Sequence, residues 1–301
     1  MRYRHLLLVV SLVFVLAACA RPIEALPTAI PRLPSTTPVA SAAALSPTIT
    51  PRPATATPLS PTVALAPTVT VSVAPTAPLD PRGEEVIVIS QPDNGSRVTS
   101  PVRVEGLGGP TFEQNLGVRL LLDDGTVLAV VGVTIDADLG QRGAYALDLP
   151  FSVSEERQGF IQVFDASARD GGILHLTSVG VTLLPSGAPD VRVAQPAPER
   201  IAIFLPAPGA TVRGGSVHVE GYALAGFEQT LLVEVLDARG TVVGGTPVMV
   251  QAPDLGQPGP FSADVAYVVS VGGPGRVVVR DVSPAHGGDA HVASAGVNLQ
   301  P

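Results

Sequence analysis

From residue 86 onward, short apolar runs rich in β-branched residues alternate with turns that contain Gly, Asp and Pro. Val86–Ile89 predicts a strand that ends in a turn at Pro92–Gly95, and Pro101–Gly106 alternates apolar and polar residues with period two. The further predicted strands are Phe112–Leu122, Val127–Ile135, Ala144–Phe151, Phe160–Phe164 and Val179–Leu184. No stretch has helical periodicity with helix caps. Strands spaced at roughly 8–12 residues, with turns between them, predict an antiparallel β-sandwich.

The same pattern occurs twice, with an offset of about 115 residues. The recurring motifs are Val104-Glu105-Gly106 with Val219-Glu220-Gly221, Phe112-Glu113-Gln114 with Phe227-Glu228-Gln229, and Asp138-Leu139-Gly140-Gln141 with Asp254-Leu255-Gly256-Gln257. The chain therefore contains an internal duplication of one domain. We predict copies at residues 86–185 and 201–301, joined by a Pro- and Gly-rich linker at residues 186–200.

Both copies share a set of Pro, Gly, Val and aromatic positions. In the first copy these are Pro92, Gly95, Val98, Pro101, Val102, Val104-Glu105-Gly106, Phe112-Glu113, Asp124-Gly125, Gly140, Gly143 and Tyr145. The second copy departs from the set at Gly215, in place of Pro101, and at Arg239, in place of Asp124. The set resembles the immunoglobulin-like domain of bacterial spore-germination proteins. This resemblance implies an all-β chain with two tandem immunoglobulin-like sandwiches outside the cytoplasm, and it carries over no catalytic residue and no germination role.

The N-terminal residues predict export and lipidation. A basic start at Met1–His5 precedes an apolar run from Leu6 to Ala18, which is shorter than the ~20 residues of a spanning helix. Small residues stand directly before Cys19. Residues 1–19 thus resemble a bacterial lipoprotein signal, which implies cleavage after residue 18 and a diacylglycerol thioether on Cys19. The alternative is a plain secretory peptide with a chance cysteine. The expected location is extracytoplasmic, at the membrane surface.

The stretch that follows Cys19 is rich in Pro, Thr, Ala and Ser, with few charged or aromatic residues. Proline removes backbone donors and disfavours a helical conformation in the residue before it. We therefore predict that residues 19–85 form a disordered tether that carries the lipid and holds the two domains away from the membrane.

Composition narrows the possible functions. The chain has one cysteine, so no intrachain disulfide is expected. Its formal net charge is −8 and it has no basic stripe, which disfavours nucleic acid as a binding partner. There is no Trp, so a sugar-stacking platform of aromatic side chains is poorly supplied. No nucleophile elbow, phosphate-binding loop or His-Glu-x-x-His motif occurs. We expect a protein that is not an enzyme and has no cofactor.

One loop of the second copy collects side chains that could bind a divalent metal. These side chains are Asp281, His286, Asp289 and His291, and the matching part of the first copy has Asp165, Asp170 and His175. The favoured interpretation is a Gly-rich turn with polar residues, and no metal site is predicted. The pairs Asp123 with Asp124, and Asp136 with Asp138, are likewise interpreted as turns, because a calcium site needs a denser set of oxygen ligands.

A candidate interaction surface follows from the predicted strands. Period-two alternation places Val102 and Val104 inward, and it places Arg103 and Glu105 outward. The same rule places Phe112, Leu116, Val118 and Leu120 inward on the next strand, with Glu113 outward. Glu105 with Glu113, and Glu220 with Glu228, would then share an outer face. They either accept hydrogen bonds at strand ends, which is the favoured interpretation, or bind a cation or a basic partner.

The sequence supports three hypotheses for function. The first is a surface lipoprotein that displays two immunoglobulin-like modules for protein interaction or envelope architecture. The second is a lipoprotein that binds a cell-wall glycan or a solute. The third is an inhibitor of an exported enzyme, since the exposed loops of a sandwich suit that task. We expect the chain to contact the membrane through the lipid on Cys19. The sequence does not identify its protein or envelope partner.

Overall fold

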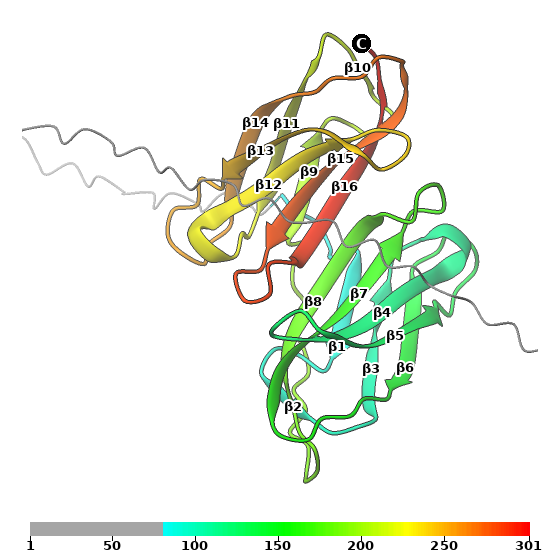
Figure 1. The fold of residues 1–301 in the computed structure, drawn as a ribbon, viewed down its shortest axis with the longest axis vertical. Helices are drawn as coiled ribbons and strands as arrows, with labels where there is room; N and C mark the ends of the chain where they lie inside the picture. The colour runs from blue at the N-terminus through cyan, green and yellow to red at the C-terminus, as the bar shows by residue number, and fades with distance from the viewer. Residues whose placement is uncertain (1–80) are drawn as a thin grey trace, which may run out of the picture. The chain divides into compact units, whose positions relative to one another are not determined.

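The computed structural model describes residues 81–301, which form two β-sandwiches (Figure 1). The first contains β1 (Ile87–Gln91), β2 (Ser96–Val98), β3 (Val102–Gly108), β4 (Asn115–Leu122), β5 (Val127–Thr134), β6 (Gly143–Leu149), β7 (Arg157–Ala166) and β8 (Ile173–Leu183). The second contains β9 (Ile201–Leu205), β10 (Thr211–Val212), β11 (Ser216–Ala223), β12 (Thr230–Leu236), β13 (Val242–Met249), β14 (Gly259–Ala266), β15 (Gly273–Val282) and β16 (Asp289–Leu299). The predicted signal peptide, Cys19 and most of the predicted tether lie outside the described residues. Within residues 81–301, no helix is long and apolar enough to cross a bilayer.

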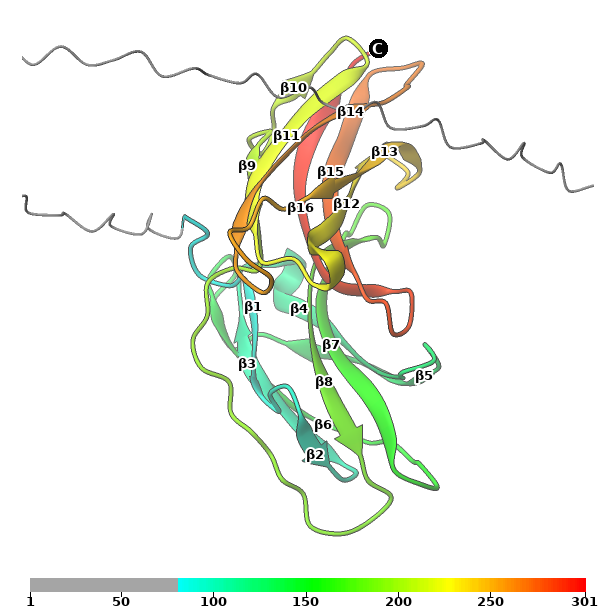
Figure 2. The ribbon, with the colours of Figure 1, turned by 90° about the vertical axis from the view of Figure 1, so that its left-hand side faces the viewer.

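Each copy has the two-layer architecture of an immunoglobulin-like sandwich. In the first copy the sheet β1-β3-β6 faces the strands β5-β4-β7-β8, and in the second β9-β11-β14 faces β13-β12-β15-β16. Figure 2 shows the two layers of each sandwich side by side. The prediction of tandem all-β sandwiches is thereby confirmed.

Two short strands depart from the expected antiparallel pattern. β2 pairs with β8 in parallel, and β10 pairs with β16 in the same way. In each copy the chain leaves the first strand through a turn, crosses to the other sheet and runs alongside its last strand. The sequence pattern does not reveal this crossover, because a run of two or three residues is too short to show its face or direction.

Alternation along the strands builds a separate core in each copy. Val102 and Val104 are buried and Arg103 is exposed, as predicted, and β11 repeats this pattern with buried Val217 and Val219. The first core is formed by β1 to β8 and the second by β9 to β16. A third, smaller cluster contains Leu176, Leu236, Val278 and Val292, with side chains from both copies.

The two copies are joined by their equivalent last strands. β8 and β16 pair antiparallel through Leu176 with Val292 and through Thr177 with His291. This pairing merges the larger sheets of the two sandwiches into one ten-stranded sheet. Two reciprocal hydrogen bonds reinforce it, because Ser178 Oγ donates to the Ala290 carbonyl at 2.6 Å and Ser294 Oγ donates to the Leu174 carbonyl at 2.8 Å. Equivalent residues therefore meet about a local twofold axis.

The Gly of the repeated Val-Glu-Gly motif lies in the central strand of each smaller sheet, where the two neighbouring strands leave no room for a side chain. A Cβ at Gly221 would overlap the Ala202 carbonyl of β9 and meet the ring of buried Phe261. Gly106 has the same surroundings in the first copy, against the Val88 carbonyl and the Tyr145 ring. The motif therefore recurs for packing reasons.

Gly221→Ala is expected to destabilise the second copy by about 2–3 kcal/mol, because overpacking forces backbone shifts in a filled core. The measurement is urea-induced unfolding followed by circular dichroism. Gly296→Ala is the matched control, since it lies in β16 and its Cβ would meet nothing within 4 Å. Equal stability of the two variants would contradict this account of the motif.

Candidate functional site

Four ionisable side chains converge where the two copies meet. Glu85 and Glu199 stand just before the first strand of their copies, and His175 and His291 are each the third residue of the last strand. One carboxylate oxygen or ring nitrogen of each residue lies within 4.8 Å of the corresponding atom of the other three. We call these four residues the interdomain cluster.

Within each copy, a glutamate oxygen faces the histidine of the same copy. His175 Nε2 lies 3.1 Å from Glu85 Oε1, and His291 Nε2 lies 3.0 Å from Glu199 Oε1. Across the copies, His175 Nε2 is 3.7 Å from Glu199 Oε2, and His291 Nε2 is 3.7 Å from Glu85 Oε1. The two imidazole rings meet edge to face, with centroids 5.1 Å apart. Each histidine thus contacts both carboxylates.

Backbone groups hold the two carboxylates in place reciprocally. The Val86 N–H donates to Glu199 Oε2 at 2.9 Å, and the Arg200 N–H donates to Glu85 Oε2 at 3.0 Å. Thr177 Oγ1 also donates to Glu85 Oε1 at 3.0 Å. Each glutamate therefore accepts an N–H from the residue that follows the other glutamate, which fixes both carboxylates at the junction.

The cluster is buried, and this changes its electrostatics. Its four side chains are between 1% and 12% exposed. Burial alone would lower the pKa of His175, but the hydrogen bond to Glu85 and the negative charges of Glu199, Glu85 and Asp165 outweigh it and raise this pKa. Burial alone would raise the pKa of Glu199, but the His291 hydrogen bond and the two imidazoles lower it. The surroundings thus favour the charged forms of His175 and Glu199, one from each copy.

A cavity of about 580 Å³ adjoins the cluster. Glu85 and His291 form part of its wall, together with Thr177 of β8 and the linker residues Gln195 and Pro198. Solvent can therefore reach the cluster beside the linker that joins the copies.

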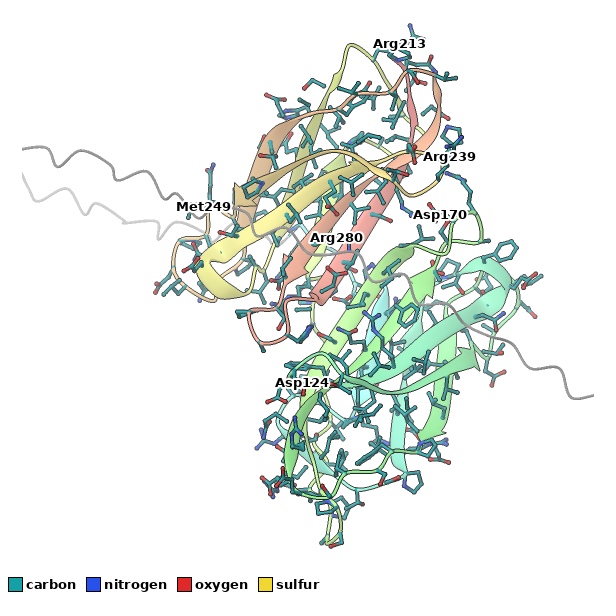
Figure 3. All side chains as sticks on the ribbon, in the orientation of Figure 1. Asp124, Asp170, Arg213, Arg239, Met249 and Arg280 are labelled. Atoms are coloured by element: carbon teal, nitrogen blue, oxygen red, sulfur yellow. The ribbon has the colours of Figure 1, made fainter. Side chains whose placement is uncertain are left out.

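The loop of the second copy does not bring together the four side chains that were considered as metal ligands. Asp281 forms an ion pair of 2.8 Å with Arg200. Asp289 forms an ion pair of 2.7 Å with Arg280, which is labelled in Figure 3. His286 lies at the hairpin tip, and its ring stacks edge to face on Phe160 of the first copy. His291 alone joins the interdomain cluster. The four side chains therefore form no shared site within this loop, because Asp281, Asp289 and His286 have other partners.

The matching residues of the first copy also separate. Asp170, labelled in Figure 3, forms an ion pair of 2.8 Å with Arg276 of the second copy. It is equivalent to His286, so the two hairpin tips make reciprocal contacts across the junction. Asp165 lies opposite His175 in the β7–β8 hairpin, and burial raises its pKa to about 6 against the lowering effect of His175. Of these three, only His175 enters the cluster.

The predicted glutamate surface is not formed as expected. Glu105 lies on β3 and pairs with Arg103 at 2.8 Å, and Glu220 lies on β11 at 3.9 Å from His218. Glu113 and Glu228, however, lie in turns before β4 and β12, in the left-handed region with φ of 55°. β3 and β11 belong to the smaller sheets, whereas β4 and β12 belong to the large one. The shared outer face of Glu105 with Glu113, and of Glu220 with Glu228, is therefore wrong.

The repeated Phe-Glu-Gln motif has a structural role instead. It forms the 3₁₀ turns η1 (Phe112–Gln114) and η2 (Phe227–Gln229), so β4 begins at Asn115, and the Phe112 side chain is 62% exposed rather than buried. Gln114 Nε2 donates to the Gln141 carbonyl at 2.9 Å, and Gln229 Nε2 donates to the Asp254 carbonyl at 3.0 Å. The acceptors belong to the repeated Asp-Leu-Gly-Gln motif, so the two motifs recur together because they contact each other.

The sequence contains one indication of the interdomain cluster, which is the recurrence of a glutamate and a histidine at equivalent positions of the two copies. Aligning the two copies places Glu85 over Glu199 and His175 over His291. A glutamate and a histidine retained in both copies, far apart within each, form one site only when the equivalent last strands pair.

Comparison with protein families matches the immunoglobulin-like domain of bacterial spore germination twice, at residues 86–172 and 200–288. Among curated proteins, none matches the sequence of this chain. A red sea bream transglutaminase structure shares 8% identity with a TM-score of 0.27, covering 72% of this chain and 31% of that one. Dimeric latent PorU from Porphyromonas gingivalis shares 11% identity with a TM-score of 0.22, covering 72% of this chain and 24% of that one. This chain thus spans at most about a third of either structure, and TM-scores this low carry no functional inference.

Proposed function

The chain belongs to the family of the immunoglobulin-like domain of bacterial spore germination, and we propose that it is a surface lipoprotein that presents two such modules for protein interaction or envelope architecture. Domains of this kind are modules of the protein-interaction type. The observation that carries the proposal is that both copies are complete sandwiches joined by their last strands, so that they present two sets of loops on one body. Loops held by a rigid scaffold are the usual place for recognition residues.

Anchoring is proposed to occur through lipid on Cys19, at the end of the signal-like segment. A diacylglycerol group with a further acyl chain gives stable membrane association, at ~0.8 kcal/mol per buried CH₂. The acidic chain supports this route, because electrostatic docking on an anionic bilayer needs basic clusters. The proposed role is binding rather than catalysis.

The anchor is tested by detergent-phase partitioning of the full chain expressed in a bacterium. The wild type is expected in the detergent phase and Cys19→Ala in the aqueous phase, because the variant has no thiol to lipidate. Ser11→Ala, which changes a polar residue inside the same apolar segment, is the control and should partition like the wild type. Recovery of the wild type in the aqueous phase would refute lipidation.

The interaction role is tested with the soluble Cys19→Ala chain, by cross-linking to purified envelope proteins and by binding to a cell-wall glycan array. A saturable protein partner with no glycan signal is expected. The cavity beside the linker favours solute or glycan binding as the alternative function. A glycan signal without a protein partner would support that alternative.

A further inference from the structure

We propose that the interdomain cluster is a binding site for one Zn²⁺ ion, which ties the two immunoglobulin-like copies together. This inference concerns the junction between the copies and does not depend on the lipid anchor or on the identity of a partner. It rests on the donor atoms, their geometry, their charge and their access to solvent.

The donor set is one that zinc uses. The cluster offers two imidazole nitrogens, from His175 and His291, and two carboxylate oxygens, from Glu85 and Glu199. Zn²⁺ takes four such ligands in structural sites, whereas Ca²⁺ and Mg²⁺ require six or more oxygen ligands. Two imidazoles among four donors therefore favour a transition metal over the harder cations.

The spacing of the donors fits a tetrahedral ion. Bonds of about 2.0–2.1 Å to a central zinc place tetrahedral ligands about 3.3 Å apart. With Glu85 Oε1 and Glu199 Oε1 as the carboxylate donors, three histidine-to-carboxylate distances are 3.0, 3.1 and 3.7 Å, and one donor atom of each of the four residues lies within 4.8 Å of the other three. Small side-chain adjustments would bring four donors to a common centre. The local twofold axis places one glutamate and one histidine of each copy around that centre.

The charges of the cluster match a divalent cation. Two carboxylates in a buried site require compensation, because an unpaired buried charge is costly. One Zn²⁺ ion neutralises both carboxylates while the histidines remain neutral, which is the form that ligates metal.

The surroundings of the cluster are those of an organised metal site. The second oxygen of each carboxylate is held by a backbone N–H of the other copy, which orients the first oxygen toward the centre. Asp165 lies directly opposite His175 in the β7–β8 hairpin, and carboxylates commonly support metal-binding histidines. The cavity that contains Glu85 and His291 in its wall gives the ion a route from solvent.

The test is zinc titration of the full chain, purified in detergent and stripped of metal with a chelator. One Zn²⁺ ion per chain is expected, and the melting temperature should rise with zinc concentration because the ion binds the folded junction. The double variant His175→Gln/His291→Gln should weaken zinc binding by more than about 100-fold, since loss of a supporting partner alone typically costs 10–100-fold.

The matched control is His218→Gln. His218 is an exposed histidine of the second copy that lies 2.8 Å from Asp264 and 3.9 Å from Glu220, so it has carboxylate neighbours without burial. This variant should bind zinc with wild-type affinity. Equal zinc affinity in the double variant and the wild type would overturn the proposal, as would failure of the wild type to bind.

Co²⁺ replacement provides a second measurement that needs no variant. Tetrahedral Co²⁺ with two nitrogen and two oxygen ligands gives intense visible absorption bands, and addition of Zn²⁺ should abolish them. Weak bands typical of six-coordinate Co²⁺ would overturn the proposal even if the double variant fails to fold. Loss of the Cys19 anchor would leave both measurements unchanged, so failure of the lipoprotein assignment is distinguishable from failure of the metal site.

Discussion

Asp170→Asn is expected to lower the free energy of unfolding by about 3–5 kcal/mol. Asp170 at the tip of the β7–β8 hairpin pairs with Arg276 of β15 at 2.8 Å, and both side chains are 6% exposed. Arg276 Nε has no hydrogen-bond partner within the described residues, so the guanidinium depends on this carboxylate. The variant leaves a buried positive charge without compensation. Urea-induced unfolding of the full chain measures the loss.

Asp124→Asn is the control, because it makes the same chemical change at an exposed position. Asp124 lies 3.4 Å from Arg157, and the two side chains are 56% and 34% exposed. Such surface pairs contribute at most about 1 kcal/mol. The double variant Asp170→Leu/Arg276→Met should recover most of the lost stability, since removing both charges leaves none unpaired. A loss in Asp170→Asn no larger than in Asp124→Asn would contradict the predicted role of the pair.

The Asp170 ion pair also predicts a pH dependence. Burial alone would raise the pKa of Asp170, but hydrogen bonds from Ser167 and Gly172 and the charge of Arg276 lower this pKa below its ordinary 3.8. The stabilisation is therefore present above pH 3.8 and disappears as the pH falls through the folded-state value. The stability difference between wild type and Asp170→Asn should accordingly shrink in acid.

The sandwich fold could be predicted from the sequence because alternation determines which side of a strand is buried. Val102 and Val104 in the first copy and Val217 and Val219 in the second point inward as period two requires. The duplication supported this prediction, since each strand was seen twice. Backbone conformation was harder to predict. Glu113 adopts positive φ although only Gly does so readily, and no propensity rule distinguishes that turn from the start of a strand.

The interdomain cluster could be predicted only in part. The residue types are evident, since each copy retains a glutamate and a histidine, but they lie about 90 residues apart within a copy, as the Glu85–His175 contact shows. Their convergence depends on the pairing of β8 with β16, and no local pattern specifies which edges of two sandwiches meet. The sequence groups His291 with the polar residues of its own loop, whereas its partners in space, Glu199 and Glu85, come from the starts of both copies.

The last prediction concerns the independence of the two cores. Leu116→Ala and Leu231→Ala remove equivalent buried side chains, 3% and 1% exposed, from the first and the second core. Each is expected to cost about 2–5 kcal/mol, because the lost transfer free energy is compounded by the cavity left behind. Leu139→Ala and Leu255→Ala are matched controls, also equivalent to each other and each 78% exposed, with changes expected within about 0.5 kcal/mol.

Hydrogen exchange with peptide-level mass spectrometry distinguishes the cores within the full chain. Leu116→Ala should speed exchange in β3, β4 and β7, and Leu231→Ala should speed it in β11, β12 and β15, because each side chain packs in only one core. β8 and β16 should respond to both variants, since they pair with each other and supply Leu176 and Val292 to the shared cluster. Faster exchange throughout both copies in either variant would mean that the junction makes the two sandwiches one cooperative unit.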